Sequence, residues 1–219
     1  MITATDHYIG EIVGKLDELG LRRNTVVIFM SDNGHSEETS LRIRRAGHSS
    51  GRMEGYFYGA SGAGNTGKWI GHKGTFFEGG IRVPAIISYP GKLPSGEVRD
   101  QIMTAMDWYP TVLELCGIER TPGSPELDGH SLLPIVQSAE ATCLYGEVLH
   151  LAWRQDWMVR DGEWKLIGKG ARDGGESGVS LHRLTDAKPE VKDYSAEKPG
   201  LVTRLRVMHE AWLKEVTPQ

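Results

Sequence analysis

The hydrophobic and polar positions along the chain predict helices alternating with strands. Apolar residues at helical spacing over residues 3–19, followed by Gly20, predict an amphipathic helix. A continuous apolar run over residues 25–31 predicts a strand buried on both faces, which is typical of a parallel sheet. A second strand is expected over residues 82–88, before a Pro-Gly turn.

The middle of the chain has a less regular pattern. Residues 34–80 are rich in glycine, and an irregular segment of this length in a compact domain is usually functional or disordered. Further on, Asp107 is expected to cap a helix that stops at Gly117. Cys116, on the apolar face of that helix, is expected to be a small buried residue. A short helical turn is expected after Asp128.

From about residue 142 the pattern changes to short strand-like segments separated by Asp-Gly and other glycine-containing turns. The last segment predicts a helix with one apolar face, made of Leu201, Leu205, Met208 and Trp212. We therefore expect residues 142–219 to form a small antiparallel sheet with one helix. Residues 1–141 are expected to belong to an α/β domain.

Composition and charge narrow the function classes. The 219 residues are 39% hydrophobic and 25% charged, which is ordinary for a globular protein. The net charge is -4, and the basic cluster Arg42, Arg44 and Arg45 is typical of a solvated loop, so nucleic-acid binding is not expected. No apolar run reaches membrane-spanning length, and the N-terminus lacks the pattern of a signal peptide. The compartment therefore stays unknown.

Candidate chemistry begins where the first apolar strand stops. Asp32 and Asn33 follow it directly, and open α/β sheets bind ligands beyond the carboxyl ends of their strands. A carboxylate and an amide oxygen are donors that Ca²⁺ or Mg²⁺ accepts. The alternative is a plain turn in which the Asp-Asn-Gly sequence serves only the backbone.

A second candidate is Lys73, which lies among glycines ahead of the sequence Glu78-Gly79-Gly80. Glycine lets backbone approach a ligand closely, and a lysine there is suited to an anion such as sulfate or phosphate. The alternative is a surface lysine in a flexible loop. Residues 62–69 imitate a phosphate-binding P-loop, but Trp69 stands where Ser or Thr is needed, and we reject that interpretation.

Four stretches together resemble a known family. "VVIFMSDNG", "GHKGTFFEGGIRVPAIISYPGKLPSGEV", "TAMDWYPTVLELCGI" and "LDGHSLLP" are similar, in order and spacing, to the C-terminal half of the arylsulfatase-type sulfatases, of the alkaline phosphatase-like superfamily. The tail resembles the C-terminal subdomain of that family. The resemblance implies an α/β fold with part of a mixed sheet and flanking helices, followed by a small antiparallel sheet with one helix.

The resemblance also implies roles for individual residues. Asp32 and Asn33 match an Asp-Asn pair that binds a divalent cation, usually Ca²⁺, with Mg²⁺ as the alternative. Lys73 matches the lysine that contacts the sulfate group, a catalytic and substrate-binding position. Asn33 favours a sulfatase, because phosphatase relatives tend to have Asp-His-Gly. His35 is a further substrate-binding candidate, for which the family implies no role, and the alternative is a loop histidine that pairs with Glu37 or Glu38.

The family's nucleophile pattern is not found in this sequence. That nucleophile is a formylglycine made in a C-x-P-S-R or C-x-A-S-R motif, and neither Cys116 nor Cys143 fits it. The two cysteines also lack metal-type spacing. Asp32 and Asn33 supply two or three of the roughly six to eight oxygens that Ca²⁺ takes. We therefore expect a sulfatase fragment that is inactive alone and associates with an N-terminal half or with a second copy.

Two other interpretations remain open. One is a non-catalytic, sulfatase-like module that binds sulfated glycans, and the other is a phosphoesterase of the same superfamily. The C-terminal tryptophans bear on the first. We expect at least two of Trp153, Trp157 and Trp164 to be core residues, and the alternative is that they stack on sugar rings. The family that the sequence resembles is usually periplasmic, lysosomal or secreted, but the sequence shows no export signal, so the resemblance leaves the compartment unknown.

Overall fold

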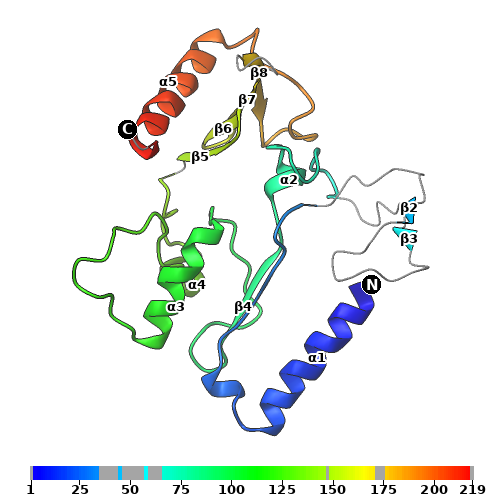
Figure 1. Ribbon diagram of the computed structural model, residues 1–219, viewed down its shortest axis with the longest axis vertical. Coiled ribbons are helices and arrows are strands. Elements are labelled where there is room, and N and C mark those ends of the chain that lie inside the picture. Colours follow the sequence, from blue (N-terminus) through cyan, green and yellow to red (C-terminus); the bar gives the residue numbers. More distant parts are fainter. Residues whose placement is uncertain are drawn as a thin grey trace. The chain divides into compact units, whose positions relative to one another are not determined.

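The computed structural model describes residues 2–34, 44–45, 57–58, 66–146, 148–170 and 176–217 (Figure 1). The chain divides into two compact units. The first comprises Met1–Met30 and Ala85–Glu147, and the second comprises Ser31–Pro84 and Val148–Gln219. The domain boundary predicted after residue 141 stays a prediction.

Both longer helices of the first unit confirm the sequence pattern. α1 (Ile2–Glu18) and α3 (Trp108–Cys116) each stop at a glycine in the left-handed region, Gly20 at φ 68° and Gly117 at φ 64°. Cys116 was expected to be buried but is exposed, because α3 ends at this residue and the segment after it is exposed. The shorter helical elements of this unit are η1 (Arg22–Asn24), η2 (Ala105–Asp107) and α4 (Leu133–Gln137).

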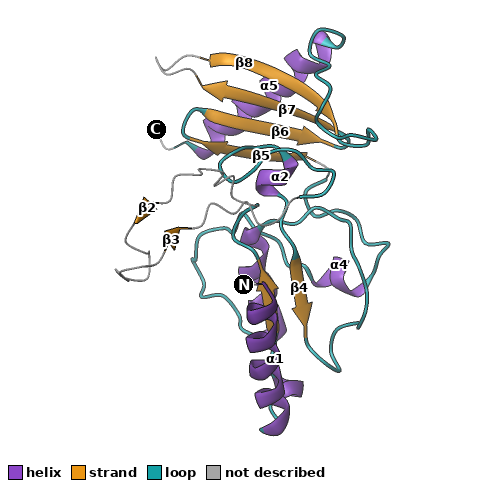
Figure 2. Cartoon of the chain, turned by 90° about the vertical axis from the view of Figure 1, so that its right-hand side faces the viewer, coloured by secondary structure: helices purple, strands orange, loops and turns teal. Residues whose placement is uncertain are grey.

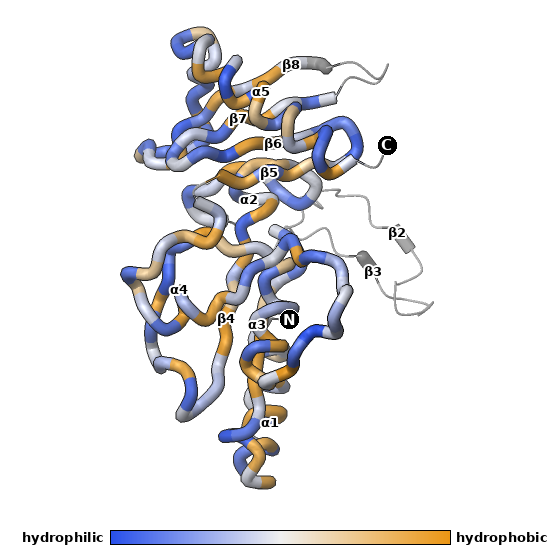
Figure 3. The backbone as a smooth tube through the Cα atoms, turned by 90° about the vertical axis from the view of Figure 1, so that its left-hand side faces the viewer, coloured by the Kyte–Doolittle hydropathy of each residue, from blue (hydrophilic) through white to orange (hydrophobic). Residues whose placement is uncertain are grey.

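The two predicted strands of the first unit pair with each other. β1 (Val27–Met30) and β4 (Ala85–Ser88) form an antiparallel ladder, not the parallel pairing that the apolar run indicated. β4 is mostly hydrophobic (Figure 3), and β1 consists of four apolar residues, but neither strand contains a buried residue. Phe29 is 40% exposed and Ile86 is 59% exposed. The burial prediction was therefore wrong for the described residues, because a two-stranded ladder leaves side chains on both faces accessible.

Asp107 lies at the centre of a buried hydrogen-bond network in the first unit. Its carboxylate accepts the backbone N–H of Thr104 at 2.6 Å, the backbone N–H of His130 at 2.8 Å and the hydroxyl of Tyr145. The predicted cap on α3 was wrong, because this carboxylate is directed to other groups. Burial, together with the bond to Asp107, raises the pKa of Tyr145. The network explains why two separate motifs, "TAMDWYPT" and "LDGH", pack together.

The C-terminal part of the second unit is a four-stranded antiparallel sheet with one helix, as predicted. Its strands lie in sequence order and are β5 (Val148–Trp153), β6 (Asp156–Asp161), β7 (Trp164–Gly170) and β8 (Glu176–Arg183). The helix α5 (Pro199–Val216) covers one face of this sheet (Figure 2). The same unit contains the short strands β2 (Arg44–Arg45) and β3 (Phe57–Tyr58), which pair with each other.

The core between the sheet and α5 is fully buried. Its members are Val159, Leu166, Leu181 and Leu205, each at 0% exposure. Trp157 and Trp164 pack against this core, whereas Trp153 is 54% exposed, so the expectation that at least two of the three tryptophans are core residues is confirmed. Within the described part of the chain, no helix is both long enough and apolar enough to cross a membrane.

Candidate functional site

The Asp32-Asn33 pair lies in a tight turn after β1. The hydroxyl of Ser31 donates to the carbonyl of Asn33 at 2.9 Å, and the backbone N–H of Ser31 donates to the carbonyl of Pro84 at 3.3 Å. The next residue is Gly34, and its N–H donates to the carbonyl of Gly80 at 3.0 Å. Asp32 is exposed and Asn33 is partly buried. The turn is therefore attached by its backbone, and the Asp32 side chain is accessible.

Lys73 lies in a second turn, which is also built from backbone bonds. The N–H of Thr75 donates to the carbonyl of His72 at 3.0 Å, and the hydroxyl of Thr75 bonds to the same carbonyl at 2.8 Å. Gly74 supplies the left-handed conformation that this turn needs, at φ 87°. The Lys73 side chain is exposed. The turn therefore presents the accessible ammonium group of Lys73 on a backbone that is fixed by the bonds between His72 and Thr75.

A short helix, α2 (Glu78–Ile81), contacts both turns. A Cβ atom on Gly34 would overlap the carbonyl oxygen of Gly79, and a Cβ atom on Gly80 would overlap the carbonyl oxygens of His72 and Thr75. Only glycine permits such approaches of backbone to backbone. The Gly79-Gly80 pair thus explains a glycine-rich motif whose purpose the sequence left open.

The structure therefore brings the segments of three predicted site residues to one helix. The turn of Asp32 and Asn33 meets α2 through Gly34, and the turn of Lys73 meets it through Gly80. The fourth candidate, His35, lies outside the described residues.

The donor set of the first turn agrees with a hard divalent cation but forms only part of a shell. Asp32 offers a carboxylate and Asn33 an amide oxygen, both suited to Ca²⁺ or Mg²⁺. Among the residues that the structure describes, no three His, Cys, Asp or Glu side chains gather as a metal site. Any cation held here would need further oxygens from other groups.

Behind α2 lies a buried ion cluster that sequence reasoning missed. The ammonium of Lys165, on β7, bonds to Glu78 Oε1 at 2.9 Å and to Glu190 Oε1 at 2.8 Å. Lys165 is 0% exposed, Glu190 is 2% and Glu78 is 4%. Burial acts to raise the pKa of Glu78, but Lys165 and Arg82 outweigh burial and hold this pKa below its ordinary value. Glu78 is therefore ionised at neutral pH.

The fold shows why Lys165 needs these partners, a need that the sequence alone does not reveal. Residues alternate across a strand, so Lys165 and Ile167 share the face of β7 opposite to the Leu166 face that packs toward α5. Ile167 is 3% exposed, so that face is also buried. A lysine on a strand that is covered on both faces needs a carboxylate partner.

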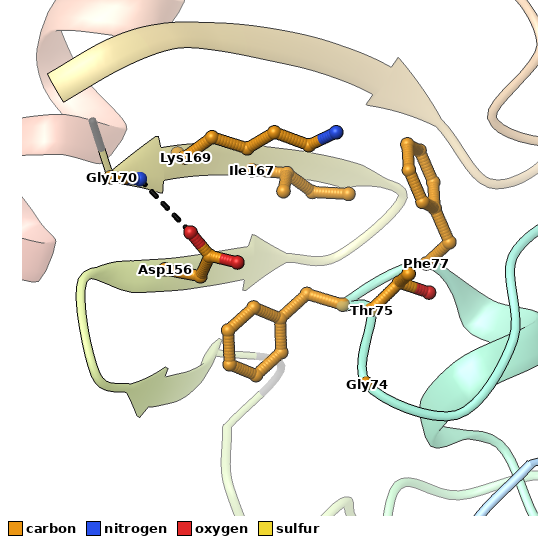
Figure 4. A pocket seen from close by; sticks show the side chains of 9 residues that line it. Gly74, Thr75, Phe77, Asp156, Ile167, Lys169 and Gly170 are labelled. Carbon is orange, nitrogen blue, oxygen red and sulfur yellow. Dashed lines mark hydrogen bonds between the residues drawn. The ribbon is translucent and has the colours of Figure 1, made fainter. Parts of the chain in front are cut away.

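A pocket of about 240 Å³ opens beside the Lys73 turn. The segment from Gly74 to Phe77 forms one wall, and β6 and β7 form the other (Figure 4). Asp156 and Lys169 contribute the charged groups, and Asp156 Oδ1 accepts the N–H of Gly170 at 2.9 Å. The wall that follows Lys73 is aromatic through Phe76 and Phe77, and the opposite wall is charged.

Comparison with known proteins agrees with these motifs. The family described as Sulfatase matches residues 1–118. Arylsulfatase D of Homo sapiens is 34% identical over 200 residues, covering 81% of this chain and 31% of that protein. Steryl-sulfatase of Mus musculus is 38% identical over 133 residues, covering 60% of this chain and 19% of that protein. The chain thus spans 19% to 31% of the length of these two relatives.

Similarity to solved structures extends over nearly the whole chain. The crystal structure of Ps i-CgsB in complex with k-i-k-neocarrahexaose superposes with a TM-score of 0.71 and 26% identity. The match covers 97% of this chain and 41% of that one. The predicted α/β fold of the alkaline phosphatase-like type is thereby confirmed.

Proposed function

Because this chain belongs to the sulfatase family, we propose that it contributes the cation-binding and sulfate-binding side of a sulfuric ester hydrolase. The observation that carries the proposal is the attachment of both candidate turns to α2 through Gly34 and Gly80. The 219 residues contain no C-x-P-S-R or C-x-A-S-R motif. The proposal therefore assigns the formylglycine nucleophile to polypeptide outside this sequence.

Each candidate residue has a distinct task in this proposal. Asp32 and Asn33 hold the divalent cation, with Ca²⁺ preferred and Mg²⁺ as the alternative. When bound, the cation would supply positive charge that shields the sulfate and orients the nucleophile. Lys73 donates hydrogen bonds to sulfate oxygens and stabilises the charge that develops on them during ester cleavage. Its exposed position on a backbone-fixed turn suits this role.

The substrate in this proposal is a sulfate ester, and we favour a sulfated glycan. The oligosaccharide in the Ps i-CgsB complex supports that choice. The pocket beside the Lys73 turn offers Asp156 and Lys169 for hydroxyl groups and an aromatic wall for a sugar ring. His35 stays a predicted substrate contact.

Reconstitution tests the proposal. This chain is combined with a sulfatase N-terminal segment that carries formylglycine, and hydrolysis of an aryl sulfate is followed with and without Ca²⁺. The chain alone should show no turnover, and the combination should show Ca²⁺-dependent turnover. Lys73→Ala should lower kcat by about 10²-fold, the usual cost of removing one donor to a developing oxyanion. Lys68→Ala, an exposed lysine on a neighbouring turn, is the matched control.

Two outcomes would contradict the hydrolase. A combination that retains sulfated glycans without turnover would favour the non-catalytic binding module. The absence of the nucleophile motif from this sequence is the observation that favours this alternative. Faster turnover of an aryl phosphate than of an aryl sulfate would favour a phosphoesterase.

Association with further polypeptide is part of the same proposal. The exposed apolar residues of the β1–β4 ladder, Phe29 and Ile86, are a feature that a partner segment or a second copy would cover. Light scattering at high protein concentration tests this point, and a stable monomer would contradict it.

A further inference from the structure

The buried ion cluster of Lys165, Glu78 and Glu190 is an expensive way to stabilise a fold. Ions removed from water lose hydration, and well-packed apolar side chains often stabilise as well or better. Here two carboxylates share one ammonium, and Arg82 completes the charge balance through its Nε atom, 2.9 Å from Glu78 Oε2. Beyond stability, such a cluster fixes the relative position of the segments that carry it, because each bond holds one atom at a set place relative to another.

The bonds of Glu190 and Lys165 fix α2 at two points. Glu190 Oε1 accepts from Lys165, while Glu190 Oε2 accepts the backbone N–H of Glu78 at 2.8 Å. The Glu78 carboxylate is bonded to Lys165 as well. One residue of α2 is therefore held by both its backbone and its side chain. Glu190 itself adopts φ 62°, an unfavourable conformation for a residue other than glycine.

From α2 the constraint continues to both candidate turns. The carbonyl of Gly80 accepts the N–H of Gly34, next to Asn33. The backbone of Gly80 also lies against the carbonyls of His72 and Thr75, on either side of Lys73. The nearest atoms in these contacts are backbone carbonyl oxygens, which can shift less than the end of a flexible side chain. A displacement of α2 therefore displaces both turns.

We propose that Lys165, Glu78 and Glu190 are positioning residues that set the geometry of the sulfate site by fixing α2 on β7. This inference rests on the proposed function for its consequence in catalysis, but not for its structural content. The C-terminal sheet then supports the site, because Lys165 on β7 holds α2 in place. It contributes no group to the sulfate in this scheme and determines where Lys73 and Asp32 stand.

Hydrogen exchange of the whole chain tests the structural part without any turnover. In Lys165→Met, amides of residues 70–82 should exchange at least about tenfold faster, whereas amides of α5 should stay near the wild-type rate. Glu190→Gln, which keeps an acceptor for the Glu78 N–H, should show the same pattern more weakly and guards against a misfolded Lys165 variant. Glu163→Gln is the matched control, since its partner Arg183 lies in an exposed ion pair on the same sheet.

The outcomes separate the two proposals. Unchanged exchange over residues 70–82, or faster exchange spread equally over α5, would overturn the positioning role. In the reconstituted enzyme, Lys165→Met should lower kcat/KM for an aryl sulfate about tenfold or more while leaving the cooperative unfolding of the sheet intact. If the wild-type combination shows no turnover while exchange responds as expected, the proposed function fails and the positioning of α2 stands.

Discussion

The β1–β4 ladder and the β5–β8 sheet both contain large apolar side chains, yet the burial of these side chains differs. Phe29 and Ile86 of the ladder are 40% and 59% exposed, whereas Val159 and Leu166 of the larger sheet are at 0%. In the larger sheet α5 packs on one face and the α2 segment contacts the other. Apolar residues in a strand therefore indicate that the strand has to be covered, but they do not reveal which segment covers it.

The largest expected effect separates these two regions directly. Leu166→Ala removes a fully buried side chain and should lower the free energy of unfolding by about 2 to 5 kcal/mol. Ile86→Ala removes an exposed one and should cost less than about 0.5 kcal/mol. Urea unfolding followed by circular dichroism measures both. Equal costs would show that the ladder is as well packed as the sheet.

The next effect compares two glycines. Gly34→Ala places a methyl group against the carbonyl of Gly79 and should destabilise the second unit by about 3 kcal/mol, since neither backbone can yield easily. Gly10→Ala, in the middle of α1 with open space around it, should instead stabilise by up to about 1 kcal/mol. Thermal unfolding distinguishes them. A neutral Gly34 variant would mean that the turn is not held against α2.

Acid should weaken the sheet and α5 through His209. Burial and the neighbouring His150 lower the pKa of His209 to about 4. The unfolded chain takes up this proton near pH 6.5, so between pH 6.5 and pH 4 it binds more protons than the folded chain. Stability should therefore fall by about 2 kcal/mol from pH 7 to pH 5.

Urea unfolding at the two pH values measures this loss. His209→Phe, which keeps an aromatic ring beside Trp157, should flatten the pH dependence. His7→Gln, at an exposed position on α1, is the control and should leave it unchanged. An unaltered pH dependence in the His209 variant would assign the effect to other groups.

The smallest effect concerns charge at the surface of the larger sheet. Glu163 and Arg183 form an exposed ion pair at 2.9 Å. Glu163→Gln should cost less than about 1 kcal/mol, because water screens such pairs. Added salt should reduce the cost further, which chemical unfolding at two ionic strengths would detect. A cost of several kcal/mol would contradict this prediction, because it would mean that the exposed pair contributes as much to the free energy of unfolding as is expected of the buried cluster around Lys165.

The local elements of this fold could be predicted because they are written in short-range patterns. Helical spacing ended by Gly20 and Gly117 gave α1 and α3, and short strand-like segments separated by glycine-containing turns gave the C-terminal sheet. The antiparallel pairing of β1 with β4 could not be predicted, because an apolar run does not indicate whether the neighbouring strand is parallel or antiparallel. Asp107 was misassigned because a carboxylate before a helix is typical of a cap, whereas two of the partners of this carboxylate, His130 and Tyr145, lie far along the chain.

The candidate site divides in the same way. Asp32, Asn33 and Lys73 could be proposed because each lies in a short motif with recognisable chemistry. The cluster behind α2 could not, because Glu78 and Lys165 are 87 residues apart. A single lysine between Trp164 and Leu166 is typical of a solvated strand position. Only the fold shows that this face of β7 is covered.

The bond between Glu190 and the first residue of α2 joins groups 112 residues apart. On the ribosome the chain emerges from its N-terminus, so both candidate turns leave the exit tunnel long before Glu190 is synthesised. Until then Glu78 lacks this partner for its backbone. This tether of α2 therefore forms only after residue 190 has been synthesised, and a stop codon ahead of that residue would leave Asp32, Asn33 and Lys73 in the chain but without the tether.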